Sequence, residues 1–228
     1  MNHNFSTIRF WREDDIGIIV PSDEKKELDS LMVSEIIAIL LATSEDKDVN
    51  HIVITNQGSR NFIRSPIDFS KCNIKNYVKL IRSLVIIIKS IEKNIIFAVN
   101  GDASDISAEF SFTGDFLIVR PEITYSLEKV KNGMPLIITD AMNYLKNPVL
   151  TSLFLGNIVN GEQIYNAGIA QFLAKGDMFY DSVKQFVKKI PKIYNVSKIT
   201  FSRNFHQTYS DPFLEEKIIE HLKNYYGL

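Results

Sequence analysis

The sequence has 228 residues, a length at which a chain buries a sizeable core without a disulfide or a structural metal. It carries 26 Lys and Arg against 27 Asp and Glu, for a net charge of −1, so it lacks the basic footprint of a nucleic-acid-binding protein. With 45% hydrophobic and 23% charged residues it has the composition of a soluble globular protein, and its single cysteine excludes an internal disulfide framework and a cysteine-rich metal site.

The hydrophobic stretches favour neither secretion nor membrane insertion. Residues 1–6 lack the basic and apolar regions of a signal peptide. The most hydrophobic stretch, residues 84–99, is interrupted by three charged residues and is shorter than the ~18 clean apolar residues that a membrane span needs. We therefore expect a cytoplasmic protein whose partners include neither nucleic acid nor membrane.

Short apolar runs predict buried strands at residues 17–20, 51–55, 95–99 and 116–119. Each run is rich in β-branched or aromatic residues and stops at Pro, Asn or Arg. The runs are continuously apolar rather than alternating, which favours strands covered on both faces.

Helical segments lie between and after these strands. Apolar spacing predicts helices over residues 31–41, 74–91, 142–155 and 161–167, and a mostly helical tail over 181–228. Asp29 or Ser30 is a candidate N-cap for the first of them. Strands alternating with helices predict an α/β fold with right-handed crossovers. We expect a core over residues 1–180 and a C-terminal helical segment over 181–228.

The tail contains lysines that alternate with apolar residues. These are Lys184, Lys188, Lys189 and Lys192. One interpretation is a helix that binds nucleic acid or a membrane. The other, which we favour, is an amphipathic surface helix that packs on its own domain or on a neighbouring subunit.

The stretch over residues 94–115 carries the clearest chemical signal. A buried strand ends at Asn100-Gly101, a polar loop follows, and Glu109 then precedes a second strand. Ligands of α/β proteins usually bind at such strand ends. A carboxylate one turn into a helix, next to Phe110 and Phe112, is a candidate acid or base if desolvation raises its pKa. The alternative is a solvated first-turn carboxylate favoured by the helix dipole.

These residues resemble the enoyl-CoA hydratase/isomerase (crotonase) superfamily. Asn100-Gly101, then Glu109 and Asp115, resemble its strand–loop–helix signature. Four further segments resemble the family in the same order, so the resemblance covers roughly residues 5 to 175. They are the opening hairpin at 9–20, the first helix at 28–41, the strand and loop at 51–62, and the segment at 154–170.

The resemblance implies a fold, an assembly and a chemistry. The family fold is a spiral of ββα turns with C-terminal oligomerisation helices, usually assembled as homo-trimers or dimers of trimers. Two backbone N–H groups form an oxyanion hole that holds the thioester carbonyl of an acyl-CoA. One or two glutamates then move protons or position water. No metal or organic cofactor is implied, since CoA enters as part of the substrate.

Matched residue by residue, the resemblance assigns Glu109 as the first catalytic glutamate and the N–H groups of Arg64 and Ile106 as the oxyanion hole. The glycines that the family has in these loops are absent here. Their replacements, Asp105 and Ile106, would adopt positive φ values only at a cost.

The second catalytic glutamate of the family falls at Lys129, with Glu128 adjacent to it. The usual Pro-Gly-Gly after Gly133-Met134-Pro135 is also missing. These departures disfavour two-glutamate hydration. They leave thioester binding and proton transfer by a single glutamate, with Glu128 or Lys129 as an auxiliary polar group.

The first loop supplies candidate substrate and CoA contacts: Arg60, Ser65, Asp68 and Lys71, with Arg64 beside them. Arginine and lysine suit CoA phosphates, although such residues also form ordinary solvated rims.

The favoured function is therefore an acyl-CoA-processing enzyme of the hydratase/isomerase type. The alternative is a degenerate paralogue that binds acyl-CoA without catalysis or serves as a partner subunit. A phosphate- or nucleotide-binding protein is disfavoured, because no Gly-rich phosphate loop is present.

Overall fold

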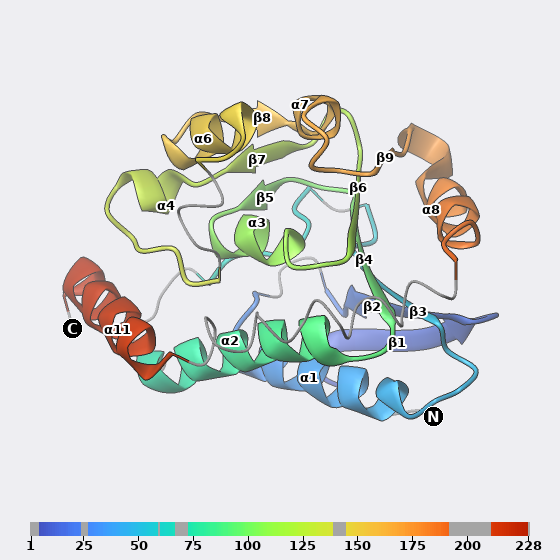
Figure 1. Ribbon diagram of the computed structural model, residues 1–228, viewed down its shortest axis with the longest axis horizontal. Helices are drawn as coiled ribbons and strands as arrows, with labels where there is room; N and C mark the ends of the chain where they lie inside the picture. The colour runs from blue at the N-terminus through green and yellow to red at the C-terminus, as the bar shows by residue number, and fades with distance from the viewer. Residues whose placement is uncertain are drawn as a thin grey trace.

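The computed structural model describes residues 5–23, 27–58, 60–66, 73–138, 145–191 and 211–227. Its main element is a six-stranded sheet with the order β1-β2-β3-β4-β6-β9 (Figure 1). The strands are β1 (Ile8–Glu13), β2 (Ile16–Pro21), β3 (His51–Thr55), β4 (Asn94–Val99), β6 (Phe116–Val119) and β9 (Phe172–Leu173). β1 and β2 form an antiparallel hairpin, and every other neighbouring pair is parallel.

The parallel strands are covered on both faces, as their continuous apolar character predicts. Along β3, Ile52 and Ile54 pack into one cluster of buried residues and Val53 into another. β4 divides in the same way, with Phe97 in the first cluster and Ile96 in the second. Successive side chains of a strand point to opposite faces, so the sheet separates two cores.

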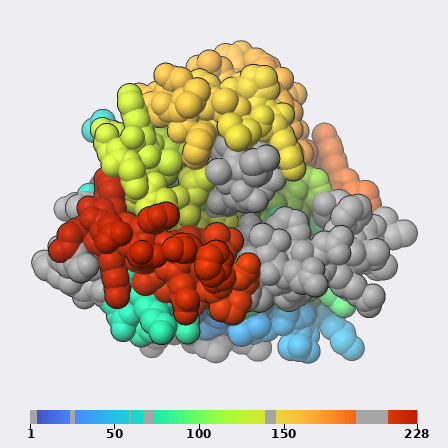
Figure 2. All heavy atoms as spheres, turned by 60° about the vertical axis from the view of Figure 1, so that its left-hand side comes forward, coloured from blue at the N-terminus to red at the C-terminus, as the bar shows by residue number. Residues whose placement is uncertain are grey.

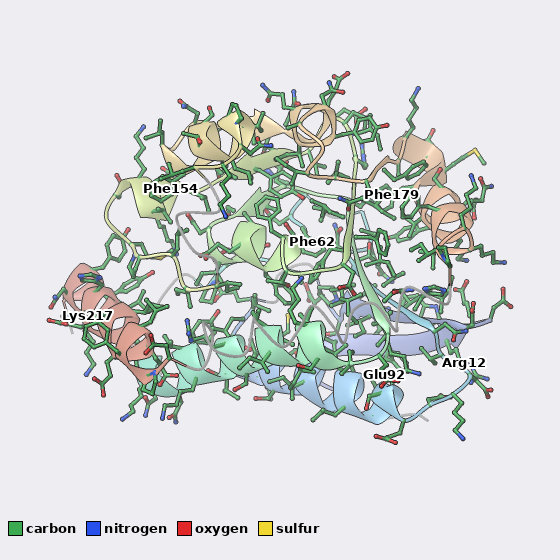
Figure 3. The ribbon with its side chains drawn as sticks, viewed as in Figure 1. Arg12, Phe62, Glu92, Phe154, Phe179 and Lys217 are labelled. Atoms are coloured by element: carbon green, nitrogen blue, oxygen red, sulfur yellow. The ribbon has the colours of Figure 1, made fainter. Side chains whose placement is uncertain are left out.

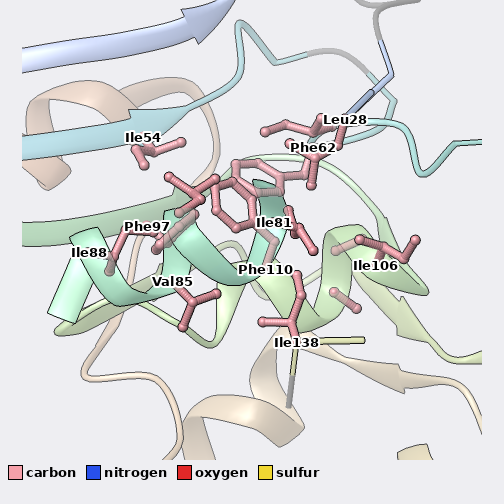
Figure 4. Close-up of a cluster of buried hydrophobic side chains, with 14 of the residues drawn as sticks. Leu28, Ile54, Phe62, Ile81, Val85, Ile88, Phe97, Ile106, Phe110 and Ile138 are labelled. Atoms are coloured by element: carbon pink, nitrogen blue, oxygen red, sulfur yellow. The ribbon is translucent and has the colours of Figure 1, made fainter. Parts of the chain in front are cut away.

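The larger core lies between the sheet and two helices, α1 (Ser30–Ser44) and α2 (Ile74–Ser90), which pack against each other. Asp29 caps α1 by accepting a hydrogen bond from the Met32 N–H at 2.8 Å. At the centre of this core Phe97 meets Phe110 edge-on, with ring centroids 4.8 Å apart (Figure 4). Figure 3 shows Phe62 in the interior of the molecule, above α2 in this view.

The smaller core is closed by α8 (Phe179–Val187), which buries Phe179, Val183 and Val187. The Tyr180 hydroxyl donates to the Asn56 carbonyl, so α8 is tied to the carboxyl end of β3. The expected boundary at residue 180 falls in the first turn of this helix. A short 3-10 helix, η1 (Gly176–Met178), precedes it.

A second, three-stranded sheet with the order β5-β7-β8 lies above α3 in Figure 1. Its strands are β5 (Ala103–Ser104), β7 (Thr124–Ser126) and β8 (Val159–Asn160), and the helices near it are α3 (Ile106–Ser111), α4 (Glu128–Lys131), α6 (Pro148–Phe154) and α7 (Gly161–Asn166). This sheet was not expected from the sequence.

The predicted helix at 142–155 is wrong at its start within the described residues. Helix α6 begins only at Pro148, with Asn147 as its N-cap. Proline suits the first helical position and disfavours helix in the residue before it. Residues 142–144 lie outside the described part.

The last helix, α11 (Pro212–Tyr226), packs against α2. Ile218, Ile219 and Leu222 are its buried residues, and the Tyr226 hydroxyl lies 3.9 Å from the Met134 sulfur. Figure 2 shows α11 across this face of the molecule, next to the surface of α4. The lysines of the tail that are described belong to α8 and to the residues just after it, where Lys184 pairs with Glu13.

Candidate active site

The loop after β4 turns sharply before it enters α3. Asp105, the residue before the helix, has φ 49° and ψ −122°, a conformation that normally requires glycine. Such a residue costs about 1–3 kcal/mol and persists only where its surroundings hold it. Its N–H donates to the Ser126 carbonyl at 2.9 Å, and its carbonyl accepts from the Glu109 N–H at 3.0 Å.

The Asp105 turn gives Ile106 two different environments. Its side chain is buried in the larger core, beside Phe110 (Figure 4). Its N–H, at the first position of α3, has no hydrogen-bond acceptor among the described residues. The predicted oxyanion donor is therefore anchored by its side chain, and its N–H group lacks an acceptor among the described residues.

The two loops that the sequence assigned to the site lie side by side. Asn61 and Asp102 form a parallel bridge. The Phe62 N–H donates to the Asp102 carbonyl, and the Asp102 N–H donates to the Arg60 carbonyl, each at 2.8 Å. These contacts place residues 60–66 next to residues 102–107.

Arg64, the other predicted oxyanion donor, is engaged with the segment before α1. It forms a parallel bridge with Glu27, and its carbonyl accepts from the Leu28 N–H at 2.8 Å. This hydrogen bond occupies the Arg64 carbonyl, whereas the predicted oxyanion donor of this residue is its N–H group.

Ser65 joins the two loops through its hydroxyl. The hydroxyl donates to the Ser104 carbonyl and accepts from the Ser107 N–H at 3.0 Å. Sequence reasoning assigned Ser65 to substrate binding, whereas here its hydroxyl bonds within the fold on both sides of Asp105. The nearby Ser107 hydroxyl is buried, with no partner within the described ranges.

Lys129 connects both loops to α4. Its ammonium group donates to the Pro66 carbonyl at 2.8 Å, and its backbone N–H donates to Asp105 Oδ1 at 2.9 Å. Burial raises the pKa of Asp105, and the neighbouring Glu128 adds to the rise, although the Lys129 N–H and ammonium group oppose it. Glu128 itself is exposed.

Glu109 is fully buried in α3, which contradicts the alternative of a solvated first-turn carboxylate. The Ile137 N–H lies 3.1 Å from Oε2 and 3.3 Å from Oε1, and the Ile138 N–H lies 2.8 Å from Oε2. The carboxylate is thus held by backbone donors from the segment after α4. Substrate reaches it only if that segment shifts.

The tyrosine behind α3 adds to the apolar character of the site. Burial raises the pKa of Tyr125, and its buried hydroxyl has no hydrogen-bond partner among the described residues. Its ring stacks on Phe112 with centroids 5.4 Å apart. Tyr125 therefore acts as a neutral packing residue.

The remaining predicted contacts lie at the edge of the site or beyond the described ranges. Arg60 is exposed, in keeping with either a phosphate contact or a solvated rim. Asp68 and Lys71 lie outside the described residues.

Sequence reasoning did not assign a role to Asp105. The signal was present, because an aspartate stands where the family has a glycine, but its contact with Lys129 cannot be read from spacing.

Within the described ranges, no group of three or more His, Cys, Asp or Glu side chains is placed to hold a metal ion. None of the helices in those ranges is long and apolar enough to cross a membrane.

No protein-family model matches the sequence, and no curated protein matches it significantly. Solved structures do match. An enoyl-CoA hydratase from Bacillus halodurans superposes with a TM-score of 0.81 at 14% identity, covering 98% of this chain and 96% of that one. An enoyl-CoA hydratase/isomerase from Mycobacterium paratuberculosis gives 0.80 at 12% identity, covering 98% and 97%.

A methylmalonyl-CoA decarboxylase also superposes, with a TM-score of 0.77 at 13% identity, covering 98% of this chain and 91% of that one. The chain therefore has the crotonase fold over nearly its whole length, with a highly divergent sequence. At these identities the likeness establishes the fold alone.

Proposed function

We propose that this protein processes an acyl-CoA thioester by chemistry of the hydratase/isomerase type. The observation that carries the proposal is the pairing in α3 of a backbone donor without an acceptor among the described residues, the Ile106 N–H, with a buried carboxylate, Glu109, three residues later. The structures with this fold include a hydratase, a hydratase/isomerase and a decarboxylase, all named for CoA substrates.

In the proposed mechanism the thioester oxygen accepts a hydrogen bond from the Ile106 N–H. That bond strengthens as negative charge develops on the oxygen of the enolate. The Arg64 N–H is the second proposed donor. Glu109 then removes or returns a proton at the α or β carbon, once the segment of Ile137 and Ile138 has moved away from its carboxylate. CoA is part of the substrate, and no resident cofactor is required.

Lys129, at the position of the family's second glutamate, favours one class of reaction over another. The Lys129 ammonium group donates to a backbone carbonyl, and it is not a carboxylate that could orient an attacking water. We therefore favour proton transfer, as in double-bond migration or α-proton exchange, over hydration. The exposed Glu128 is at most an auxiliary group.

The CoA part is proposed to meet Arg60, Asp68 and Lys71 at the rim of the first loop. The assembly we propose is a homo-trimer or a dimer of trimers. Both proposals come from the resemblance and not from a contact in the structure.

A second candidate is a non-catalytic paralogue that binds acyl-CoA or serves as a partner subunit. It is favoured by the full burial of Glu109 under Ile137 and Ile138. In that case the carboxylate stabilises the fold and never reaches substrate.

One experiment separates the two functions. Crotonyl-CoA and butyryl-CoA are incubated with the protein in D₂O and followed by proton NMR, which reports hydration, double-bond migration and α-proton exchange together. Turnover of any kind by the wild type that is lost in Glu109→Gln supports the enzyme. Line-broadening of the thioester without turnover supports the binding paralogue. The absence of both refutes an acyl-CoA ligand.

A further inference from the structure

We propose that Asp105 and Ser65 are positioning residues that hold the Ile106 N–H as an oxyanion donor at a turn that has no glycine at residues 102–106. The inference deepens the proposed function and rests on it. Two side chains would hold the turn that orients the Ile106 N–H, a turn that glycine adopts without strain.

The first reason is the conformation of Asp105. Its φ of 49° and ψ of −122° set the direction of the peptide group whose N–H belongs to Ile106. A residue with a Cβ leaves such a conformation unless its neighbours fix it. The question is therefore which contacts fix this one.

Asp105 is fixed at three points. Its N–H donates to the Ser126 carbonyl, and its carbonyl accepts from the Glu109 N–H. The third contact belongs to the side chain, since Oδ1 accepts from the Lys129 N–H at 2.9 Å. Leu127, the N-cap of α4, makes no side-chain cap, so Asp105 supplies this hydrogen bond from another part of the chain.

Ser65 fixes the residues on either side. Its hydroxyl bonds both the carbonyl of Ser104 and the N–H of Ser107, and so it spans the turn that contains Asp105 and Ile106. The Ser65 backbone belongs to the first loop, so the same hydroxyl also sets the distance between the two loops. Ser65 is itself nearly buried, which shields these hydrogen bonds from water.

The result is a donor that cannot rotate away. The Ile106 side chain is held in the core (Figure 4). Hydrogen bonds hold Asp105 and Ser107 on its two sides. Its N–H is left open among the described residues. Preorganised donors of this kind stabilise developing charge without reorganising during the reaction.

The test uses butyryl-CoA labelled with ¹³C at the thioester carbon, which reports hydrogen bonding to the carbonyl oxygen by its chemical shift. Wild-type protein is compared with Asp105→Ala, Asp105→Asn and Ser65→Ala. Asp211→Ala is the matched control, because it also removes an aspartate that accepts one backbone N–H, at 2.9 Å, but at the start of α11.

We expect a downfield shift of the bound carbon in the wild type that is mostly lost in Asp105→Ala and in Ser65→Ala. Turnover should fall about 10-fold with little change in KM, less than the ~10²–10³-fold loss when an oxyanion donor is removed outright. Asp105→Asn should behave like the wild type, because asparagine keeps an acceptor oxygen and tolerates positive φ. Asp211→Ala should change neither readout.

Several results would overturn the inference. An unchanged carbonyl shift in Asp105→Ala and Ser65→Ala would show that neither side chain positions the donor, while the proposed function would stand. Loss of turnover in Asp105→Asn as complete as in Asp105→Ala would show that Asp105 acts through its charge or its proton. If Asp105→Ala does not fold, the carbonyl shift of butyryl-CoA bound to Ser65→Ala decides whether the inference holds. Failure of the wild type to bind butyryl-CoA would refute the proposed function itself.

Discussion

Replacing Glu109 with glutamine separates the chemical role of this carboxylate from its structural one. The carboxylate accepts from two backbone donors, the Ile137 and Ile138 N–H groups, at full burial. A hydrogen bond to a charged group contributes about 1.5–3 kcal/mol and one between neutral groups about 0.5–1.5 kcal/mol. Glutamine can still place its oxygen at the Oε2 position, so the loss is about 1 kcal/mol for each donor, or about 2 kcal/mol in all.

Two assays follow from this estimate. For a chain of this size about 2 kcal/mol lowers Tm by about 4–8 °C, which differential scanning calorimetry measures directly. Acid–base groups typically contribute about 10²–10⁴-fold to rate, and the D₂O exchange assay on butyryl-CoA should show a loss of that size. A loss of about 2 kcal/mol is smaller than the stability of about 5–15 kcal/mol that native domains have, so we expect Glu109→Gln to fold and both effects to be measured on folded protein.

The chain offers a matched control in Glu35. Its carboxylate also accepts from two backbone donors, the Ser6 and Thr7 N–H groups, each at 2.8 Å, but it lies on α1. Glu35→Gln should lower Tm and leave exchange unchanged. Wild-type exchange by Glu109→Gln would refute the acid–base assignment. An unchanged Tm in Glu109→Gln would refute the stabilisation that we assign to the hydrogen bonds from the Ile137 and Ile138 N–H groups to the Glu109 carboxylate.

Three further predictions concern stability. Burial acts to raise the pKa of Glu35, but hydrogen bonds from Thr7 and Ser6 outweigh this effect, so the pKa is lowered. The ionised carboxylate therefore stabilises the fold above about pH 4.3, and this stabilisation is lost as the pH falls through the lower pKa of the folded state. Glu35→Gln should therefore reduce the acid-induced loss of stability in urea titrations at pH 3–5, and an identical acid limb would contradict this. Gly161→Ala should cost about 3 kcal/mol or more by urea unfolding, since a Cβ there would lie 1.8 Å from the Arg120 carbonyl oxygen, and a near-neutral result would contradict that contact. Phe97→Ala should cost about 3–5 kcal/mol, because the ring is fully buried against Phe110, and a smaller loss would mean that the core refills the cavity.

The main sheet could be predicted because each of its central strands is an uninterrupted apolar run. Residues 51–55 and 95–99 are strands over the full predicted length, and Asp29 caps α1 as one of two candidates. Burial on both faces leaves a local signal in the sequence itself. The position of Glu109 one turn into a helix was also predicted correctly, because the preceding strand and loop locate that turn.

The second sheet could not be predicted. Strands β5 and β8 have two residues each, too few to show a period, and they exist because β7 lies between them. The contacts of the site are equally non-local. Lys129 reaches the Pro66 carbonyl across 63 positions and Asp105 across 24, and no spacing rule connects them.

The departures from the family are connected in three dimensions, although the sequence presents them as separate losses. The aspartate that replaces a glycine accepts from the backbone N–H of the lysine that replaces a glutamate. That lysine in turn holds the carbonyl of Pro66, in the first loop, whose Ser65 bonds back to the turn around Asp105. Restoring glycine at 105 would remove the acceptor of the Lys129 N–H, and restoring glutamate at 129 would remove the donor to the Pro66 carbonyl. Lys129→Glu would also place a second carboxylate beside Asp105 and a negative charge against a carbonyl oxygen. Under the proposed function, these contacts make the site a different way of holding one oxyanion donor, rather than a two-glutamate site that has lost its residues.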